Sequence, residues 1–124
     1  MARSVSFVVH AAPLSTNKAY KLTSKGGFAR MYLSEEANSF KRICLLAAKL
    51  AKPRYWSSTE RYSLGLDFYF KDNRPDSDGP LKLVLDALQG CLYNNDRQID
   101  EVTYRRFIDA VAPRVEVRIS VRTQ

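Results

Sequence analysis

Residues 62–88 read YSLGLDFYFKDNRPDSDGPLKLVLDAL. Over the first nine positions, large apolar side chains alternate with smaller or more polar ones, and this period of two predicts a half-buried β-strand. Apolar residues then recur at the spacing of one helical face: Leu81, Val84, Leu85 and Leu88. Pro80 is favourable near the start of that helix, with Asp78 or Gly79 as the expected N-cap. The stretch therefore predicts a strand that leads through an acidic loop into a helix.

A second, longer helix is expected between Ser34, as its N-cap, and Pro53, which ends it. Its core-facing residues are predicted from apolar positions at helical spacing: Phe40, Ile43, Cys44, Ala47, Leu50 and Ala51. Together with the segments that alternate like strands, the two helices predict one α+β domain over residues 1–124. In this domain a mixed β-sheet carries two main helices packed on it.

The other strands are expected at the two ends of the chain. Residues 4–11 alternate at the N-terminal end, and residues 102–111 and 114–122 alternate at the C-terminal end. The last two are predicted to pair as a hairpin around Pro113. Residues 13–30 are polar and contain glycine and lysine, so a functional or mobile loop is expected there.

The composition favours a folded protein of the cytoplasm. The hydrophobic fraction is 45% in 124 residues, and no apolar run approaches the roughly 20 residues that span a bilayer. The first five residues lack the apolar block of a secretory signal. Cys44 and Cys91 fall on apolar helical positions and are expected to be buried thiols. With His10 as the only histidine, a zinc site is not expected.

Charge is distributed unevenly along the chain. There are 20 Lys+Arg against 13 Asp+Glu, and every aspartate lies between Asp67 and Asp109. Basic charge raises affinity for phosphate backbones without specifying a sequence, and by itself it leaves nucleic-acid binding undecided. A basic protein that gathers its carboxylates in one region suggests a metal-dependent enzyme acting on nucleic acid.

The acidic residues have the spacing of a possible Mg²⁺ site. Asp76 and Asp78 can face one ion if the loop turns, and Mg²⁺ usually takes one or two carboxylates with waters and substrate phosphate. Lys82 and Asp86 follow Asp78 at intervals of four, along one side of the helix. Asp96 would have to approach through the fold. The alternative is structural: a helix cap, ordinary ion pairs along the helix, and turn residues.

The same residues resemble a known family. Asp76-Ser77-Asp78-Gly79-Pro80-Leu81-Lys82, then Asp86-Ala87-Leu88, then Asn95-Asp96-Arg97-Gln98-Ile99 closely resemble the motif of RusA Holliday junction resolvases. Weaker similarities are Pro13-x-Ser15-x-Asn17-x-x-Tyr20 and Tyr32-x-Ser34. The resemblance covers nearly the whole chain and implies a RusA-like fold. Gly79 replaces the family's usual Asn, and Asn95 replaces the first Asp of a frequent pair.

The resemblance implies a site and a reaction. Asp76, Asp78 and Asp96 would be the metal-binding catalytic carboxylates, and Lys82 the catalytic lysine. Asp86 is a weaker candidate, which could equally position Lys82. The implied function is Mg²⁺-dependent cleavage of Holliday junctions in DNA recombination and repair, with Mn²⁺ as a substitute ion. Gly79 and Asn95 put the level of activity and the metal affinity in question.

The resemblance also implies partners: branched DNA, no membrane, and a second copy of the chain in a C2 homodimer, with the last two strands as interface candidates. Candidate DNA contacts are Asn17, Lys18, Tyr20, Lys21, Lys25, Arg30 and Arg74. Arg105 and Arg106 could also track phosphates. For any single one of them, a solvated surface cation or a core aromatic is the favoured explanation, and Trp56 is undecided between packing and base stacking.

Two other functions remain open. The first is a non-catalytic protein of the same fold that binds branched DNA, with Gly79 and Asn95 as signs of decay. The second is an unrelated metal-binding or scaffolding domain whose basic surface only confers solubility. DNA affinity that falls steeply with salt would argue against the second, because the slope counts neutralised phosphates.

Overall fold

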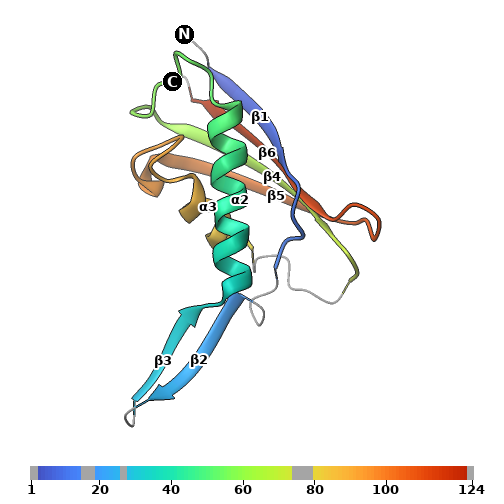
Figure 1. Ribbon diagram of the computed structural model, residues 1–124. Helices are drawn as coiled ribbons and strands as arrows, with labels where there is room; N and C mark the ends of the chain where they lie inside the picture. The colour runs from blue at the N-terminus through green and yellow to red at the C-terminus, as the bar shows by residue number, and fades with distance from the viewer. Residues whose placement is uncertain (1–2, 15–18, 26–27, 74–79, 123–124) are drawn as a thin grey trace.

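The computed structural model describes residues 3–14, 19–25, 28–73 and 80–122, and within residues 20–31 it describes the backbone alone. A four-stranded sheet forms the body of the protein, in the order β1 (Ser4–Val9), β6 (Arg114–Val121), β4 (Tyr62–Phe70) and β5 (Ile99–Ile108). β4 pairs parallel with β5, whereas the other pairs are antiparallel. Helices α2 (Glu35–Ala51) and α3 (Leu81–Leu88) lie over one face (Figure 1). The predicted α+β fold is confirmed.

The predicted hairpin between the last two strands is wrong, because β4 lies between them. β4 alternates as predicted, and its core-facing side chains are fully buried, which suits an inner strand. α3 carries the chain back over the sheet, and such a crossover produces parallel pairing of β4 with β5. The chain then turns at Asp109, whose N–H donates to the Phe70 carbonyl at 2.8 Å. It returns as β6 on the other side of β4.

The prediction for α2 is partly correct. Ser34 caps the helix by accepting a hydrogen bond from the Ala37 N–H at 3.1 Å. The buried residues are Ala37, Phe40, Cys44 and Ala48. Ile43 and Leu50, which were expected in the core, are exposed. The apolar arc of α2 is therefore wider than the face that the sheet covers. No described helix has both the length and the apolar character to cross a membrane.

The predicted loop over residues 13–30 contains two strands instead. β2 (Tyr20–Lys25) and β3 (Phe28–Leu33) pair antiparallel in a separate two-stranded sheet that extends away from the body (Figure 1). The Ser34 N–H donates to the Ala19 carbonyl at 2.9 Å and closes the base of this hairpin. The mostly polar sequence of β2 has no period-two apolar pattern, so hydrophobic alternation could not reveal it.

Both cysteines are buried free thiols, as predicted. Burial raises the pKa of Cys44 to about 12. Its thiol is therefore protonated at neutral pH, and it behaves as a small apolar core residue.

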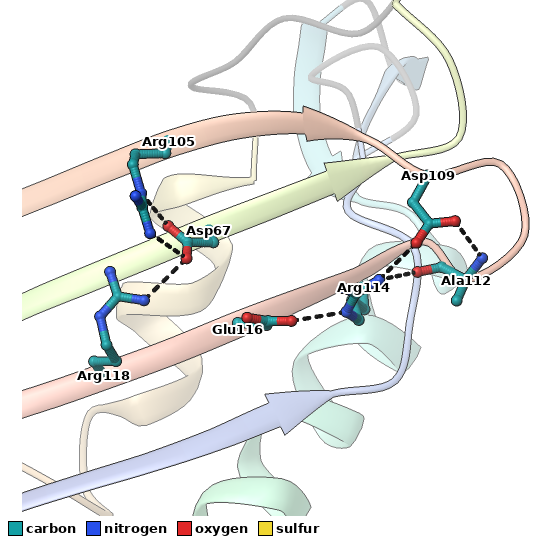
Figure 2. Close-up of polar contacts among 7 residues, drawn as sticks. All are labelled: Asp67, Arg105, Asp109, Ala112, Arg114, Glu116 and Arg118. Atoms are coloured by element: carbon teal, nitrogen blue, oxygen red, sulfur yellow. Dashed lines mark hydrogen bonds and ion pairs between the residues drawn. The ribbon is translucent and has the colours of Figure 1, made fainter.

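Arginines and acids cross-link the sheet face that faces away from the helices (Figure 2). Asp67 on β4 is only 3% exposed. It accepts two hydrogen bonds of 2.9 Å from Arg105 on β5 and one of 3.0 Å from Arg118 on β6. The hydrogen bonds from Arg105, followed by the one from Arg118, lower the pKa of Asp67 against the opposing effect of burial. One carboxylate thus joins three neighbouring strands.

We expect Asp67→Asn to lower the free energy of unfolding by about 2 kcal/mol at pH 7. This is less than the 3–5 kcal/mol typical of a fully buried pair, because both guanidiniums reach water. The folded-state pKa is depressed, so the ionic contribution is present above the unfolded-state pKa and is lost as pH falls through the folded-state pKa. Urea unfolding between pH 7 and pH 2 should show the wild-type advantage shrinking over the lower part of that range.

The matched control for this prediction is Asp100→Asn. Asp100 pairs with Arg61 and Arg122 at the surface, where solvent screening weakens ion pairs. We expect a smaller loss from this variant. Equal losses from the two variants would contradict a special role for the buried carboxylate.

Candidate active site

Asp96 opens a 3-10 turn, η1 (Asp96–Gln98), immediately before β5. Asn95 caps the turn, its side-chain oxygen accepting from the Arg97 N–H at 2.9 Å. The Asp96 N–H donates to the side-chain oxygen of Gln89, just beyond α3, at 3.2 Å. The backbone at Asp96 is therefore held between its own cap and the end of α3, while its side chain is exposed.

Gln98 anchors this turn to the rest of the fold. Its side-chain oxygen accepts from the N–H groups of Asn94 and Asn95 at 2.8 and 2.9 Å. Its amide nitrogen donates to the carbonyls of Ser58 and Glu60 at 2.9 and 2.8 Å. One amide thus makes four hydrogen bonds and ties the residues around Asp96 to the segment that leads into β4.

A group of aromatic side chains packs beneath the turn. Tyr93 is fully buried, and its hydroxyl donates to the Leu85 carbonyl at 2.6 Å. The Tyr93 ring lies 6.3 Å from that of Tyr62, which stacks on Trp56 at 5.6 Å. The Trp56 indole donates to the Leu92 carbonyl at 2.8 Å. These contacts assign Trp56 to packing, the first of the two roles considered for it.

Asp86 and Asp96 both act through their charges on one buried hydroxyl. The pKa of Tyr93 is raised first by burial and then by the negative charges of Asp96 and Asp86. Lys82 lies one helical turn before Asp86 on α3, and both side chains are exposed.

A helix cap and ion pairs along the helix were the structural alternatives for the charged residues at α3, and the structure bears them out only in part. The N-cap of α3 is Pro80, without a side-chain capping hydrogen bond, so the expected cap at Asp78 or Gly79 is wrong. Lys82 and Asp86 do not form an ion pair with each other among the contacts of the described residues. Within the described residues, neither charge is neutralised by the other.

Apart from Asp72, the described aspartates separate into two groups. Asp67, Asp100 and Asp109 each bind arginine, and the pKa of each is lowered. The pKa of Asp67 is lowered mainly by the hydrogen bond from Arg105, and that of Asp100 by the hydrogen bond from Arg61. The pKa of Asp109 is lowered mainly by the hydrogen bond from the Ala112 N–H. In the part of the chain that the structure describes, Asp86 and Asp96 have no arginine or lysine in an ion pair. Exposed carboxylates without a basic partner fit the hard-oxygen ligand set of Mg²⁺.

The remaining predicted acids, Asp76 and Asp78, lie outside the described residues, as do Arg74, Asn17 and Lys18. Asp76 and Asp78 belong to the segment of the sequence that joins the end of β4 to the start of α3. Asp96 lies beside the other end of α3, which rises about 12 Å over its eight residues. Among the described residues alone, no group of three metal-ligating side chains is assembled. Convergence of Asp76, Asp78 and Asp96 on one ion therefore stays a prediction.

The predicted DNA contacts fall into two regions. Tyr20, Lys21, Lys25 and Arg30 belong to the β2–β3 hairpin, whose backbone is described here. Arg105 is bound to Asp67, and Arg106 lies over the Phe70 ring at 4.6 Å and donates to Asn73 at 3.2 Å. Phosphate binding by these residues stays a prediction.

A family model described as endodeoxyribonuclease RusA matches residues 11–120. The chain belongs to the RusA endodeoxyribonuclease family. The match spans most of the 124 residues and confirms the resemblance drawn from the acidic motif. A search of curated proteins gave no match.

Within this RusA family member, sequence reasoning missed the residues that position Asp96. Gln89, Tyr93 and Gln98 hold the turn by hydrogen bonds and packing. The only sequence signal was the place of Gln98 two residues after Asp96 in the quoted motif. Its carbonyl partners Ser58 and Glu60 lie some 40 positions earlier in the chain, and such pairing is not readable from local spacing.

We expect Gln98→Ala to lower the free energy of unfolding by about 2 kcal/mol, because four hydrogen bonds are lost at a partly buried position. Amide exchange at Asn94, Asn95 and Arg97 should accelerate more than at the centre of β4, measured by hydrogen exchange and NMR. The control Gln98→Glu keeps the oxygens that accept from Asn94 and Asn95, so it should protect those two amides better. Unchanged exchange in Gln98→Ala would contradict the anchoring role.

Proposed function

We propose that this RusA family member is a Mg²⁺-dependent endodeoxyribonuclease that resolves Holliday junctions by paired cleavage of two DNA strands. The observation that carries the proposal is the pair of exposed carboxylates, Asp86 and Asp96, without basic partners among the described residues of a chain that belongs to a nuclease family. A purely structural use of these acids would favour pairing with arginine, as at Asp67.

The proposed metal ligands are Asp76, Asp78 and Asp96, with Asp86 as a nearby fourth carboxylate. When bound, Mg²⁺ would lower the pKa of a water and stabilise charge on the phosphate. Lys82 would contact the scissile phosphate through its ammonium group. Asn95 and Gln98 would hold Asp96 in place while the substrate binds. The fit rests on carboxylate oxygens, which Mg²⁺ prefers over nitrogen and sulfur donors.

The basic N-terminal half would bind the DNA backbone. Residues 1–66 hold 11 Lys+Arg against three acids, and each phosphate contact adds to the salt dependence of binding. The proposed contacts are Asn17, Lys18, Tyr20, Lys21, Lys25, Arg30 and Arg74. Four of them, Tyr20, Lys21, Lys25 and Arg30, lie on the extended β2–β3 hairpin, which would reach along a junction arm.

A four-way junction has near two-fold symmetry, and a C2 dimer would present two sites in matching relation. β6 pairs on both edges within the sheet, so it no longer stands as an interface candidate. β5 is an outer strand with exposed Val102, Tyr104 and Ile108. A long outer strand with apolar side chains favours pairing with another chain, and the proposed dimer interface is therefore at β5.

We expect Asp96→Asn and Asp78→Asn each to reduce junction cleavage on the order of 10²–10³-fold, a typical loss when one charged group that acts on the transition state is removed. The assay compares a synthetic four-way junction with a matched linear duplex, in Mg²⁺ or EDTA. Asp100→Asn removes an arginine-bound carboxylate and should retain wild-type cleavage.

Cleavage of the junction at two symmetric positions, dependent on Mg²⁺, would support the proposal. Tight junction binding without cleavage by the wild-type protein would contradict it and favour a branched-DNA-binding protein of the same fold. Absence of binding would contradict both functions.

We expect Asn95→Asp to raise Mg²⁺ affinity about five- to tenfold. An aspartate can cap η1 as asparagine does, and it adds a negative charge beside Asp96, worth on the order of 1 kcal/mol at the surface. Isothermal titration calorimetry measures this without reference to activity. Asn94→Asp adds the same charge one residue further away and should have the smaller effect; equal effects would place the metal elsewhere.

A further inference from the structure

Helix α2 and the loop that follows it form a basic part of the surface. Between residues 37 and 59 the chain has no Asp or Glu, but it has five basic residues: Lys41, Arg42, Lys49, Lys52 and Arg54. All of these except Lys41 are exposed, and none takes part in an ion pair among the described residues. Positive charge without acidic partners attracts anions to this surface.

The positive charge of α2 acts on the segment that leads to Asp96. At about 100° per residue, Arg42, Lys49 and Lys52 fall within an arc of roughly 80° on one side of the helix. Burial raises the pKa of the Cys91 thiol, and the charges of Lys52 and Lys49 oppose that rise. Cys91 belongs to the segment between α3 and η1. The field of the two lysines therefore reaches the part of the chain just before the candidate active site.

The loop after α2 is fixed against the same part of the chain. The Trp56 N–H donates to the Pro53 carbonyl at 3.1 Å and closes a turn at the end of the helix. The Trp56 indole donates to the Leu92 carbonyl at 2.8 Å. Further along the loop, the Ser58 carbonyl accepts from the side-chain amide of Gln98 in η1 at 2.9 Å. The loop is therefore held in a defined position relative to η1.

The turn at the end of α2 presents one aromatic ring to solvent. Trp56 stacks on Tyr62 inside the protein, whereas its neighbour Tyr55 is 71% exposed. The guanidinium of Arg54 lies over the Tyr55 ring, 5.6 Å from its centroid. Proteins that bind unpaired nucleic acid combine exposed aromatic rings, on which bases stack, with cations that follow the backbone. Tyr55 and Arg54 together provide this combination.

The residues Lys49, Lys52, Arg54 and Tyr55 are together called here the α2-end patch. The patch lies at the end of α2 opposite to the β2–β3 hairpin (Figure 1). Because α2 rises about 25 Å over its 17 residues, the patch is separate from the DNA contacts proposed for the hairpin. The hydrogen bonds of the loop connect it instead to η1 and the segment before it.

The alternative is that these cations only keep the protein soluble. A largely exposed aromatic ring does not serve solubility, and its place among cations favours a ligand that offers both anions and flat rings. Nucleic acid offers both, in its phosphates and its bases. An acidic peptide would offer carboxylates to the same cations, but the chain belongs to a family of endodeoxyribonucleases. DNA is therefore the ligand that these observations favour.

We propose that the α2-end patch binds one strand of the DNA substrate, with Lys49 and Lys52 on its phosphates and an unpaired base stacked on Tyr55. The proposal rests on the nuclease function proposed above for the identity of the ligand. Phosphate contacts raise the affinity for any DNA, whereas stacking on Tyr55 requires a base that is free of its pair. The patch therefore favours branched or partly single-stranded DNA over plain duplex.

The phosphate contacts are tested with the full chain in EDTA, where Mg²⁺-dependent cleavage does not occur. Fluorescence anisotropy measures the binding of a labelled 20-nucleotide single strand and of the matched duplex at several salt concentrations. The double variant Lys49→Gln, Lys52→Gln should reduce the slope of log affinity against log salt by about 1.4 for the single strand and about 1.8 for the duplex. The matched control Lys49→Arg, Lys52→Arg keeps both charges and should keep the wild-type slopes.

Stacking is tested by Tyr55→Ala on the same two probes. This variant should weaken binding of the single strand at least about fivefold and change the affinity for the duplex less than about twofold. The control Tyr55→Phe keeps the ring and should bind both probes like the wild type. Trp56, the one tryptophan of the sequence, packs on Tyr62, and unchanged Trp56 fluorescence in each variant shows that the loop keeps its fold.

Three results with a wild-type protein that binds DNA would overturn the proposal and leave the nuclease function standing. The first is unchanged salt slopes in the double glutamine variant. The second is a Tyr55→Ala variant that binds the single strand like the wild type, or that loses as much affinity for the duplex. The third is competition by a 20-residue polyglutamate as strong as that by unlabelled single strand, since any polyanion would then suffice.

Junction cleavage separates this proposal from the nuclease function. The expected changes in binding, together with no cleavage of a four-way junction by the wild type in Mg²⁺, would support the patch and contradict the nuclease function. A wild-type protein that binds neither probe nor the junction would overturn both.

Discussion

β4 pairs with a neighbouring strand on both of its edges, and this pairing determines the order of the strands and the position of α3. β4 holds β6 antiparallel on one side and β5 parallel on the other. The parallel pair requires a crossover, and α3 supplies it. That crossover carries the chain from the acidic segment at one end of α3 to Asp96 beside the other end. Asp67, bound by arginines from both neighbouring strands, strengthens this pairing on the face that no helix covers.

Much of this arrangement could be predicted from the sequence. The alternation in β4 and the Ser34 cap were each encoded within a few residues, and both are present. The predicted core face of α3 is correct in part: Val84 and Leu88 are buried, but Leu83 and Ala87 are buried where Leu81 and Leu85, which are only partly buried, were expected. The predicted hairpin between the last two strands failed because strand order is set by which strand is buried on both edges, a property of the whole sheet. The exposure of Leu50 had the same origin, since helical periodicity marks an apolar arc but not how much of it a neighbour covers.

The candidate site was predictable to a similar extent. The acidic motif identified Asp96 and Lys82, and the family match over residues 11–120 confirms the resemblance. The motif did not reveal that the charges of Asp86 and Asp96 both raise the pKa of Tyr93, or that Gln98 holds the turn through carbonyls far away in the sequence. Those contacts depend on tertiary structure, which brings the segment before β4 against η1.

We propose that Asp96 and the acidic segment before α3 hold one metal centre. Paramagnetic broadening of backbone NMR signals by Mn²⁺ would locate the ion, because the effect falls steeply with distance from it. We expect strong broadening at Asp86 and Asp96 that Asp78→Asn greatly reduces, with little broadening at Asp67, Asp100 and Asp109. Broadening at Asp96 that is unaffected by Asp78→Asn, or centred on the arginine-bound aspartates, would contradict it.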